Sequence, residues 1–272
     1  WTGSGKGAFR ATSTRQGTTM QELDHIRACS AYLATLLDRD AGLADWLSRE
    51  KNLHRRVPLT ELYEDLRRQV AGTESLTQLM TAYRLFKQRH FLRISGRDLL
   101  GWANLAETTG QLSDLASVAL QVGLETLADR PLWWLADTDH DAWLRVREAT
   151  PLVILGLGKL GGYELNYVSD IDLLFLRGSP ESDSPEPPDS VVAINRFCSA
   201  LCRLMAESHE GDRVFQVDLR LRPLGQDGPL VPLLQAAIDH YLHCGRPWER
   251  QMLLKTRPVA GVRSVGAAFL QE

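Results

Sequence analysis

A short apolar run that ends in a cluster of glycines limits what this chain can fold into. Leu152-Val153-Ile154-Leu155 has the length of a buried strand, and four of the seven residues 156–162 are glycines. Such a loop can turn tightly and bring its N–H groups close to a phosphate, and Lys159 adds a positive charge. The sequence therefore predicts a strand followed by a phosphate-binding loop, with contacts from Gly158, Lys159, Gly161 and Gly162.

The same loop also matches the glycine spacing of dinucleotide-binding proteins, at Gly156, Gly158 and Gly161. That fold needs a crossover helix and an acidic residue before its next strand. Here the next predicted strand begins at residue 170, which leaves no room for either. We interpret the match as accidental.

Two aspartates alternate on that next strand, which we predict over residues 170–176. Side chains two positions apart share one face of a strand, so Asp170 and Asp172 project together while Ile171 and Leu173 face the core. Adjacent carboxylates repel each other unless a cation lies between them, and Mg²⁺ prefers such oxygen ligands. Asp170 and Asp172 are therefore candidate metal ligands.

A third strand is predicted over 213–222, where apolar residues alternate with polar ones. Its polar face carries Asp218, Arg220 and Arg222. A third carboxylate can hold a second metal or act on a nucleophile, and arginines suit bidentate phosphate binding. Each strand alone is also explained by a solvated face or an ion pair. Both strands after a glycine loop favour phosphoryl transfer with two Mg²⁺ ions, with Mn²⁺ as the alternative.

The rest of the chain indicates how these elements are organised. Apolar residues recur with helical spacing over 20–149, and residues 1–19, rich in Gly, Ser and Thr, are expected to be disordered or derived from cloning. The proline-rich stretch 178–190 is predicted to be a solvated loop, and 248–269 a helix broken at Pro258. We expect an α+β fold, with a helical subdomain over 20–149 and a small catalytic sheet with flanking helices over 150–272.

Composition excludes several classes of protein. A formal net charge of −3 argues against a general nucleic-acid binder, and no apolar run reaches the ~20 residues of a membrane span. The four cysteines lack a CxxC pair, which favours reduced thiols in the cytoplasm. Two groups, Cys198 with Cys202 and His240 with His243 and Cys244, have metal-like spacing, but we interpret both as structural because they lie in apolar helical patterns.

The segment 156–175, GLGKLGGYELNYVSDIDLLF, resembles the DNA polymerase β nucleotidyltransferase superfamily. It is most similar there to the bifunctional glutamine synthetase adenylyltransferase/adenylyl-removing family. Three further blocks share the resemblance, 85–101, 217–231 and 245–261, so it covers nearly everything after residue 20. The family carries two related nucleotidyltransferase domains in one long polypeptide, and this chain would be one of them.

The resemblance implies a function. In the family, one domain uses ATP to adenylylate a tyrosine of glutamine synthetase, and the other removes the AMP by phosphorolysis, which gives ADP. The segments 97–101, 164–166 and 246–250 resemble the N-terminal, adenylyl-removing copy. Partners implied are glutamine synthetase, ATP, ADP, phosphate and a PII signalling protein. Two alternatives stay open, adenylylation by the same fold and a non-catalytic nucleotide- or partner-sensing module.

The resemblance also implies roles for individual residues. Asp170, Asp172 and Asp218 would be the catalytic carboxylates that bind metal. The glycine pair of the superfamily matches Gly161 and Gly162, and Ser169 lies where it would touch a phosphate.

Overall fold

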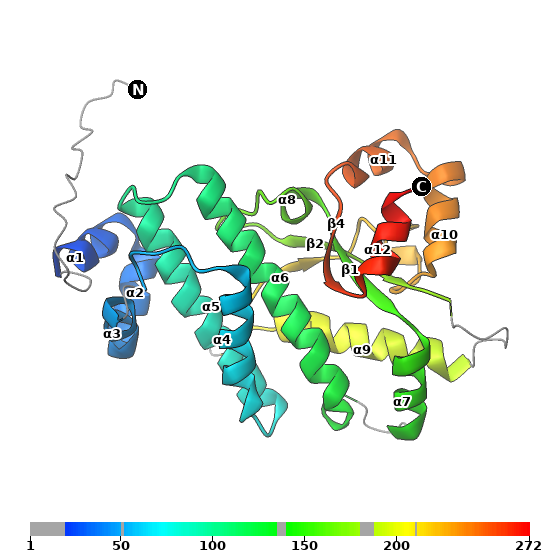
Figure 1. Cartoon of the computed structure of the whole chain (residues 1–272), viewed down its shortest axis with the longest axis horizontal. Coiled ribbons are helices and arrows are strands. Elements are labelled where there is room, and N and C mark those ends of the chain that lie inside the picture. The colour runs from blue at the N-terminus through cyan, green and yellow to red at the C-terminus, as the bar shows by residue number, and fades with distance from the viewer. Residues whose placement is uncertain (1–19, 50–51, 135–139, 180–187, 210) are drawn as a thin grey trace. The chain divides into compact units, whose positions relative to one another are not determined.

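The structure, a computed structural model, describes residues 20–49, 52–134, 140–179, 188–209 and 211–272 (Figure 1). The predicted tail 1–19 and residues 180–187 of the predicted loop lie outside these ranges. The chain forms two compact units. One contains the described residues up to Arg56 together with Gln88–Thr108, and the other contains Val57–Lys87 and Thr109–Glu272.

The first half of the chain is helical, as the sequence predicted. Side chains cap two of the helices, since Ser30 accepts from the backbone N–H of Leu33 and Asp40 from that of Gly42. The elements are α1 (Met20–Cys29), α2 (Ala31–Arg39), α3 (Ala41–Ser48), α4 (Leu59–Ala71), α5 (Leu76–Leu99), α6 (Leu105–Asp129), η2 (Pro131–Trp133) and α7 (His140–Ala149).

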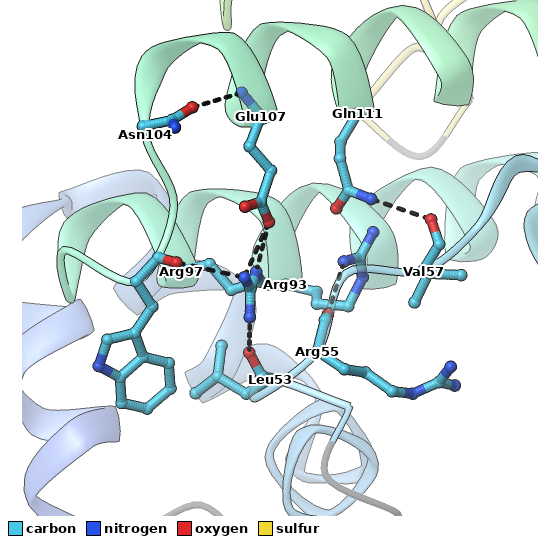
Figure 2. A network of polar contacts seen from close by, with 9 residues as sticks. Leu53, Arg55, Val57, Arg93, Arg97, Asn104, Glu107 and Gln111 are labelled. Carbon is cyan, nitrogen blue, oxygen red and sulfur yellow. Dashed lines mark hydrogen bonds and ion pairs between the residues drawn. The ribbon is translucent and has the colours of Figure 1, made fainter. Parts of the chain in front are cut away.

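The first unit is held together by leucines and by two buried arginines. Its apolar core joins α1, α2 and α3 to the last turns of α5. Arg97 donates to the carboxylate of Glu107 at 2.8 Å and to the carbonyl oxygen of Leu53 at 3.2 Å, and Arg93 donates to the carbonyl oxygen of Arg55 at 3.3 Å (Figure 2). Buried guanidinium groups need such partners, because an unpaired buried charge is costly. These bonds fix the chain before α4.

The second unit contains a four-stranded sheet in the order β3-β2-β1-β4. Strand β1 pairs antiparallel with both β2 and β4, whereas β2 and β3 are parallel. Together with the helices around it, this sheet confirms the predicted α+β class. The strands are β1 (Leu152–Gly156), β2 (Ile171–Arg177), β3 (Val217–Asp218) and β4 (Arg257–Gly261).

Helices cover the sheet. On one face Val153, Leu155, Leu174 and Leu176 pack against α10 (Leu234–Asp239), the π-helical turn η4 (His240–Cys244) and α12 (Arg263–Leu270), of which α10 and α12 are labelled in Figure 1. Residues of the opposite face, such as Ile154 and Phe175, are also buried. The remaining helices of this part are α8 (Gly158–Gly161), α9 (Pro188–Ala206), η3 (Gly225–Asp227) and α11 (Pro247–Leu253).

The prediction of a helix over 248–269 is wrong in its middle. Residues 257–261 form β4, between α11 and α12. Because β4 is at the edge of the sheet, it can contain Pro258, which has no N–H to donate, and it can shift register opposite Ile154 and Leu155.

The third predicted strand is much shorter than the range 213–222. Only Val217 and Asp218 pair with β2. The strand ends there because the Asp218 carboxylate accepts from the backbone N–H of Arg220 at 2.8 Å, which turns the chain. Arg220 and Arg222 therefore do not continue a strand face.

Within the described ranges, no helix combines the length and the apolar character that a membrane crossing requires.

Candidate active site

Two of the predicted carboxylates are neighbours in the sheet. Strands β2 and β3 pair in parallel, with Ile171 opposite Val217 and Asp172 opposite Asp218. Ile171 is fully buried and Asp172 half-buried, as the alternation predicted. Asp170 lies one residue before β2 begins. The parallel pairing therefore brings together two carboxylates that are 46 positions apart in the chain.

The carboxylate of Asp172 is in an unfavourable electrostatic position. Burial raises its pKa above the ordinary value, and the negative charges of Asp218 and Asp170 raise it further. Lys159 and Arg220 oppose this effect. The four charged groups thus lie close enough to act on the Asp172 carboxylate.

Asp218 is stabilised as an anion by Arg220. The guanidinium Nε donates to Oδ1 at 3.1 Å and Nη2 donates to Oδ2, so the pair is bidentate. These hydrogen bonds lower the pKa of Asp218 despite its partial burial. The same pair raises the pKa of Arg220. The two neighbouring aspartates therefore have pKa values shifted in opposite directions.

The donor chemistry of this pair suits a hard divalent cation. Asp172 carries negative charge that its neighbours do not fully compensate, and a cation would relieve this repulsion. Asp218 offers oxygens that Arg220 now occupies, so an ion would share or displace that guanidinium. No group of three or more metal-ligating side chains gathers around one point in the part of the chain that the structure describes.

The glycine loop lies against Asp172. The backbone N–H of Leu157 donates to the carbonyl oxygen of Asp172 at 2.9 Å, and the helical turn α8 begins at Gly158. Gly158 has a left-handed backbone, with φ of +52°, and a Cβ there would lie 2.6 Å from the Asp172 carboxylate. Only glycine satisfies both conditions.

Two more predicted residues contact each other beside the loop. The Lys159 ammonium donates to the Ser169 hydroxyl at 3.2 Å, and that hydroxyl donates to the side-chain oxygen of Asn166. Lys159 is exposed, and Ser169 immediately precedes Asp170. The structure thus brings two of the predicted residues, Lys159 and Ser169, into contact, and Asn166 joins them.

The two adjacent glycines differ in what surrounds them. A Cβ on Gly161 would collide with the backbone carbonyl of Lys255, whereas one on Gly162 would come within 3.1 Å of only the flexible Lys255 side chain. Gly161 therefore has a packing role, besides any role toward phosphate. The Lys255 ammonium also pairs with Glu164, which fixes residues 254–256 beside the loop.

Arg222 binds the backbone of its own turn and not the carboxylates. Its guanidinium donates to the backbone oxygens of Leu219 at 2.8 Å, Gln226 at 3.2 Å and Gly228 at 3.4 Å. These bonds hold the turn that follows β3. Arg222 thus supports the loop that carries Arg220.

A stripe of polar side chains on α6, absent from the sequence prediction, holds the loops of the candidate site. Ser113, Ser117 and Gln121 are each four residues apart and so share one helix face. Their acceptor oxygens bind the backbone N–H of Leu165 at 3.3 Å, Arg257 Nη2 at 3.1 Å and the backbone N–H of Gly261 at 2.8 Å. Polar residues spaced every four positions in an otherwise apolar helix are the signal that could have revealed this stripe.

Arg257 connects the stripe to the glycine loop. Besides Ser117, it donates to the carbonyl oxygen of Leu160 at 3.2 Å, and its guanidinium lies 3.8 Å from the centre of the Tyr163 ring. Its partial burial lowers the pKa of this guanidinium from the usual value. One side chain therefore ties α6, α8 and β4 together.

Cys198 and Cys202 agree with a structural role, whereas Cys244 is exposed. None of the four forms a disulfide, and Cys198 is fully buried in α9. Burial raises the pKa of Cys202 to about 12, so this thiol stays protonated and unreactive at neutral pH.

Comparison with known proteins identifies a family whose model matches this chain. The model of the glutamate-ammonia ligase adenylyltransferase family matches residues 20–272, which include every site residue described above.

Individual relatives agree with this match. A bifunctional glutamine synthetase adenylyltransferase/adenylyl-removing enzyme of Thioalkalivibrio sulfidiphilus is 35% identical over 97% of this chain and 27% of its own length. Enzymes with the same name are 34% identical in Nitrosococcus oceani, over 93% of this chain and 26% of theirs, and in Streptomyces coelicolor, over 90% and 23%. The chain thus spans about a quarter of the length of these relatives.

Proposed function

The chain belongs to the glutamate-ammonia ligase adenylyltransferase family, and we propose that it removes AMP from an adenylylated tyrosine of glutamine synthetase. The reaction proposed is phosphorolysis, in which inorganic phosphate takes the AMP group and ADP is released. The names of the relatives include both this activity and its opposite.

The observation that carries the proposal is the pairing of Asp172 with Asp218 beside the glycine loop. A nucleotidyltransferase must neutralise the charge of a phosphoryl group while two oxygens exchange on its phosphorus. Paired carboxylates, a close-lying backbone loop and the cations Lys159 and Arg220 are the groups that such a reaction needs.

The proposed reaction exchanges one oxygen on the phosphorus for another. An oxygen of inorganic phosphate bonds to the phosphorus of the tyrosyl-AMP, and the bond from that phosphorus to the tyrosine oxygen breaks. The tyrosine oxygen leaves with the bonding electrons and takes up the proton that phosphate loses. Asp172 and Asp218, with Asp170 nearby, would hold Mg²⁺, which neutralises charge on the phosphoryl oxygens. Lys159 and Arg220 add positive charge near the same carboxylates.

The direction of the reaction rests on three segments. Residues 97–101, 164–166 and 246–250 resemble the adenylyl-removing copy, and the second of them contributes Glu164 and Asn166 to the site. The proposed role is cytoplasmic, which agrees with the four free cysteines.

Incubation with adenylylated glutamine synthetase tests the proposal. With Mg²⁺ and phosphate, but no ATP, we expect release of ADP in proportion to the AMP removed. Incorporation of AMP from ATP into unmodified glutamine synthetase by this chain, without phosphate-dependent ADP release, would instead assign the opposite activity to it. Neither reaction would indicate a non-catalytic module.

A further inference from the structure

Two residues with unusual backbone conformations flank the carboxylates. In the described part of the chain, Tyr163 and Leu224 are the non-glycine residues with positive φ, at +59° and +62°. Tyr163 directly follows the glycine loop, and Leu224 lies in the turn after Asp218. Such a backbone costs an ordinary L-residue about 1 kcal/mol or more, so it calls for a reason.

The side chain of Leu224 is mostly exposed, so packing offsets little of this strain. The backbone N–H of Gly225 donates to the carbonyl oxygen of Arg222 at 2.8 Å, which closes a turn with Pro223 and Leu224 at its centre. The position after proline in a turn with this left-handed backbone is usually glycine or asparagine. Leucine stands there instead, and 63% of it is exposed.

Two other apolar residues are exposed to solvent on segments beside the site. Val168 is 93% exposed in the turn 166–169, two residues before Asp170. Leu254 is 84% exposed and precedes Lys255, which pairs with Glu164 next to the glycine loop. Turn tips normally carry small or polar residues, because these hydrogen-bond locally and remain solvated. We call Val168, Leu224 and Leu254 the apolar rim.

We propose that the apolar rim is the docking surface for the folded protein whose tyrosine carries the AMP. This inference rests on the proposed function, since a tyrosyl-AMP can reach Asp172 only if its parent protein lies against the segments around the site. Exposed aliphatic side chains offer nothing to the charged phosphates of a free nucleotide. They stabilise contact with an apolar patch on a protein, where their burial excludes water.

Leu224→Asn is the decisive variant. Asparagine tolerates the left-handed backbone better than leucine, so the variant should unfold at a higher denaturant concentration than the wild type. At the same time we expect the KM for adenylylated glutamine synthetase to rise about tenfold, the loss typical of an important interface residue. Turnover of free adenylyl-tyrosine should change less than about twofold, because that substrate has no protein surface.

Leu132→Asn is the matched control, since Leu132 is 82% exposed in η2, far along the chain from the site segments. It should leave the KM for both substrates unchanged. Val168→Asn should act like Leu224→Asn. Binding of glutamine synthetase to the immobilised protein, measured without phosphate, should weaken in the two rim variants and not in the control.

Three results separate the possibilities. Unchanged binding and KM in both rim variants would overturn the docking surface, and equal losses on adenylyl-tyrosine would reassign these residues to the reaction itself. If the wild type releases no ADP from either substrate, the proposed function fails. Rim-dependent binding of glutamine synthetase in that case would still support the docking surface.

Discussion

Asp172 and Asp218 stand opposite each other on the parallel strands β2 and β3, and their pKa values are shifted in opposite directions. The difference has a clear cause, because Arg220 binds Asp218 directly whereas burial and two other carboxylates act on Asp172. Ionised Asp172 therefore reduces the stability of the fold, whereas the bond from Arg220 to Asp218 contributes to it. The uncompensated charge on Asp172 creates a site for positive charge.

Replacement of Asp172 by asparagine should stabilise the protein in the absence of divalent cations. Because its pKa is raised by folding, the ionised side chain destabilises the folded state. The penalty is full above the raised pKa and vanishes below the ordinary carboxyl pKa of about 4. Urea unfolding should therefore show a gain of less than about 1 kcal/mol at pH 7, given the solvent screening of a half-exposed group.

At pH 3, where the carboxyl group is protonated in both states, the gain from Asp172→Asn should disappear. Asp45→Asn, at an exposed position in α3, serves as control and should change stability little at either pH. A loss of stability on Asp172→Asn at pH 7 would contradict the electrostatic account.

Removal of the Arg220 guanidinium should shift the pH dependence of activity. Arg220 lowers the pKa of Asp218, so Arg220→Gln raises it, and the acidic limb of the activity profile should move to higher pH. Arg220→Lys should shift the acidic limb less than Arg220→Gln does, because an ammonium keeps the charge but not the bidentate geometry. A profile that only falls in height, with its acidic limb unmoved, would show that Arg220 does not act through Asp218.

The glycine pair offers a test of close packing. Gly161→Ala should cost several kcal/mol, on the order of 2–4, since its Cβ would meet the backbone carbonyl of Lys255. Gly162→Ala should cost less than about 1 kcal/mol, because the flexible Lys255 side chain can move away. Guanidinium unfolding of the two variants measures the difference. Similar costs at both positions would mean that the segment at Lys255 is less closely packed than described.

Arg257 and Ser117 should be energetically coupled. Their hydrogen bond links α6 to the loop region, so Ser117→Ala and Arg257→Lys should each destabilise the protein by about 1–2 kcal/mol. A double-mutant cycle should give a coupling energy of about 1 kcal/mol. Pairing Thr35→Ala of α2 with Arg257→Lys provides the control, for which we expect additive effects. Additivity in the Ser117 cycle as well would remove the proposed link.

Where the local pattern was sufficient, the sequence predicted the fold well. Strands β1 and β2 and the alternation of Ile171 with Asp172 follow from periodicity and were found. The edge strand β4 was missed because Pro258 is compatible with a strand only at the border of a sheet, and strand order is not visible locally.

The site was predicted in its residue types more than in its geometry. The alternation of polar and apolar residues predicted Arg220 beside Asp218 on a strand. In the structure the backbone N–H of Arg220 donates to the Asp218 carboxylate, which ends the strand and folds the guanidinium back. In the same turn the Arg222 guanidinium donates to backbone carbonyl oxygens. Ser117 and Arg257 meet only in the folded chain, 140 positions apart, and no local pattern could pair them.

The most direct test of the central claim is the rate of phosphate-dependent ADP release from adenylylated glutamine synthetase in Asp172→Asn and Asp218→Asn. Both variants should retain their fold by circular dichroism and lose at least about a hundredfold in kcat, at saturating Mg²⁺, because each removes a charge that the reaction centre uses. Asp45→Asn should keep wild-type activity. Turnover within a fewfold of wild type in both folded variants would contradict the account.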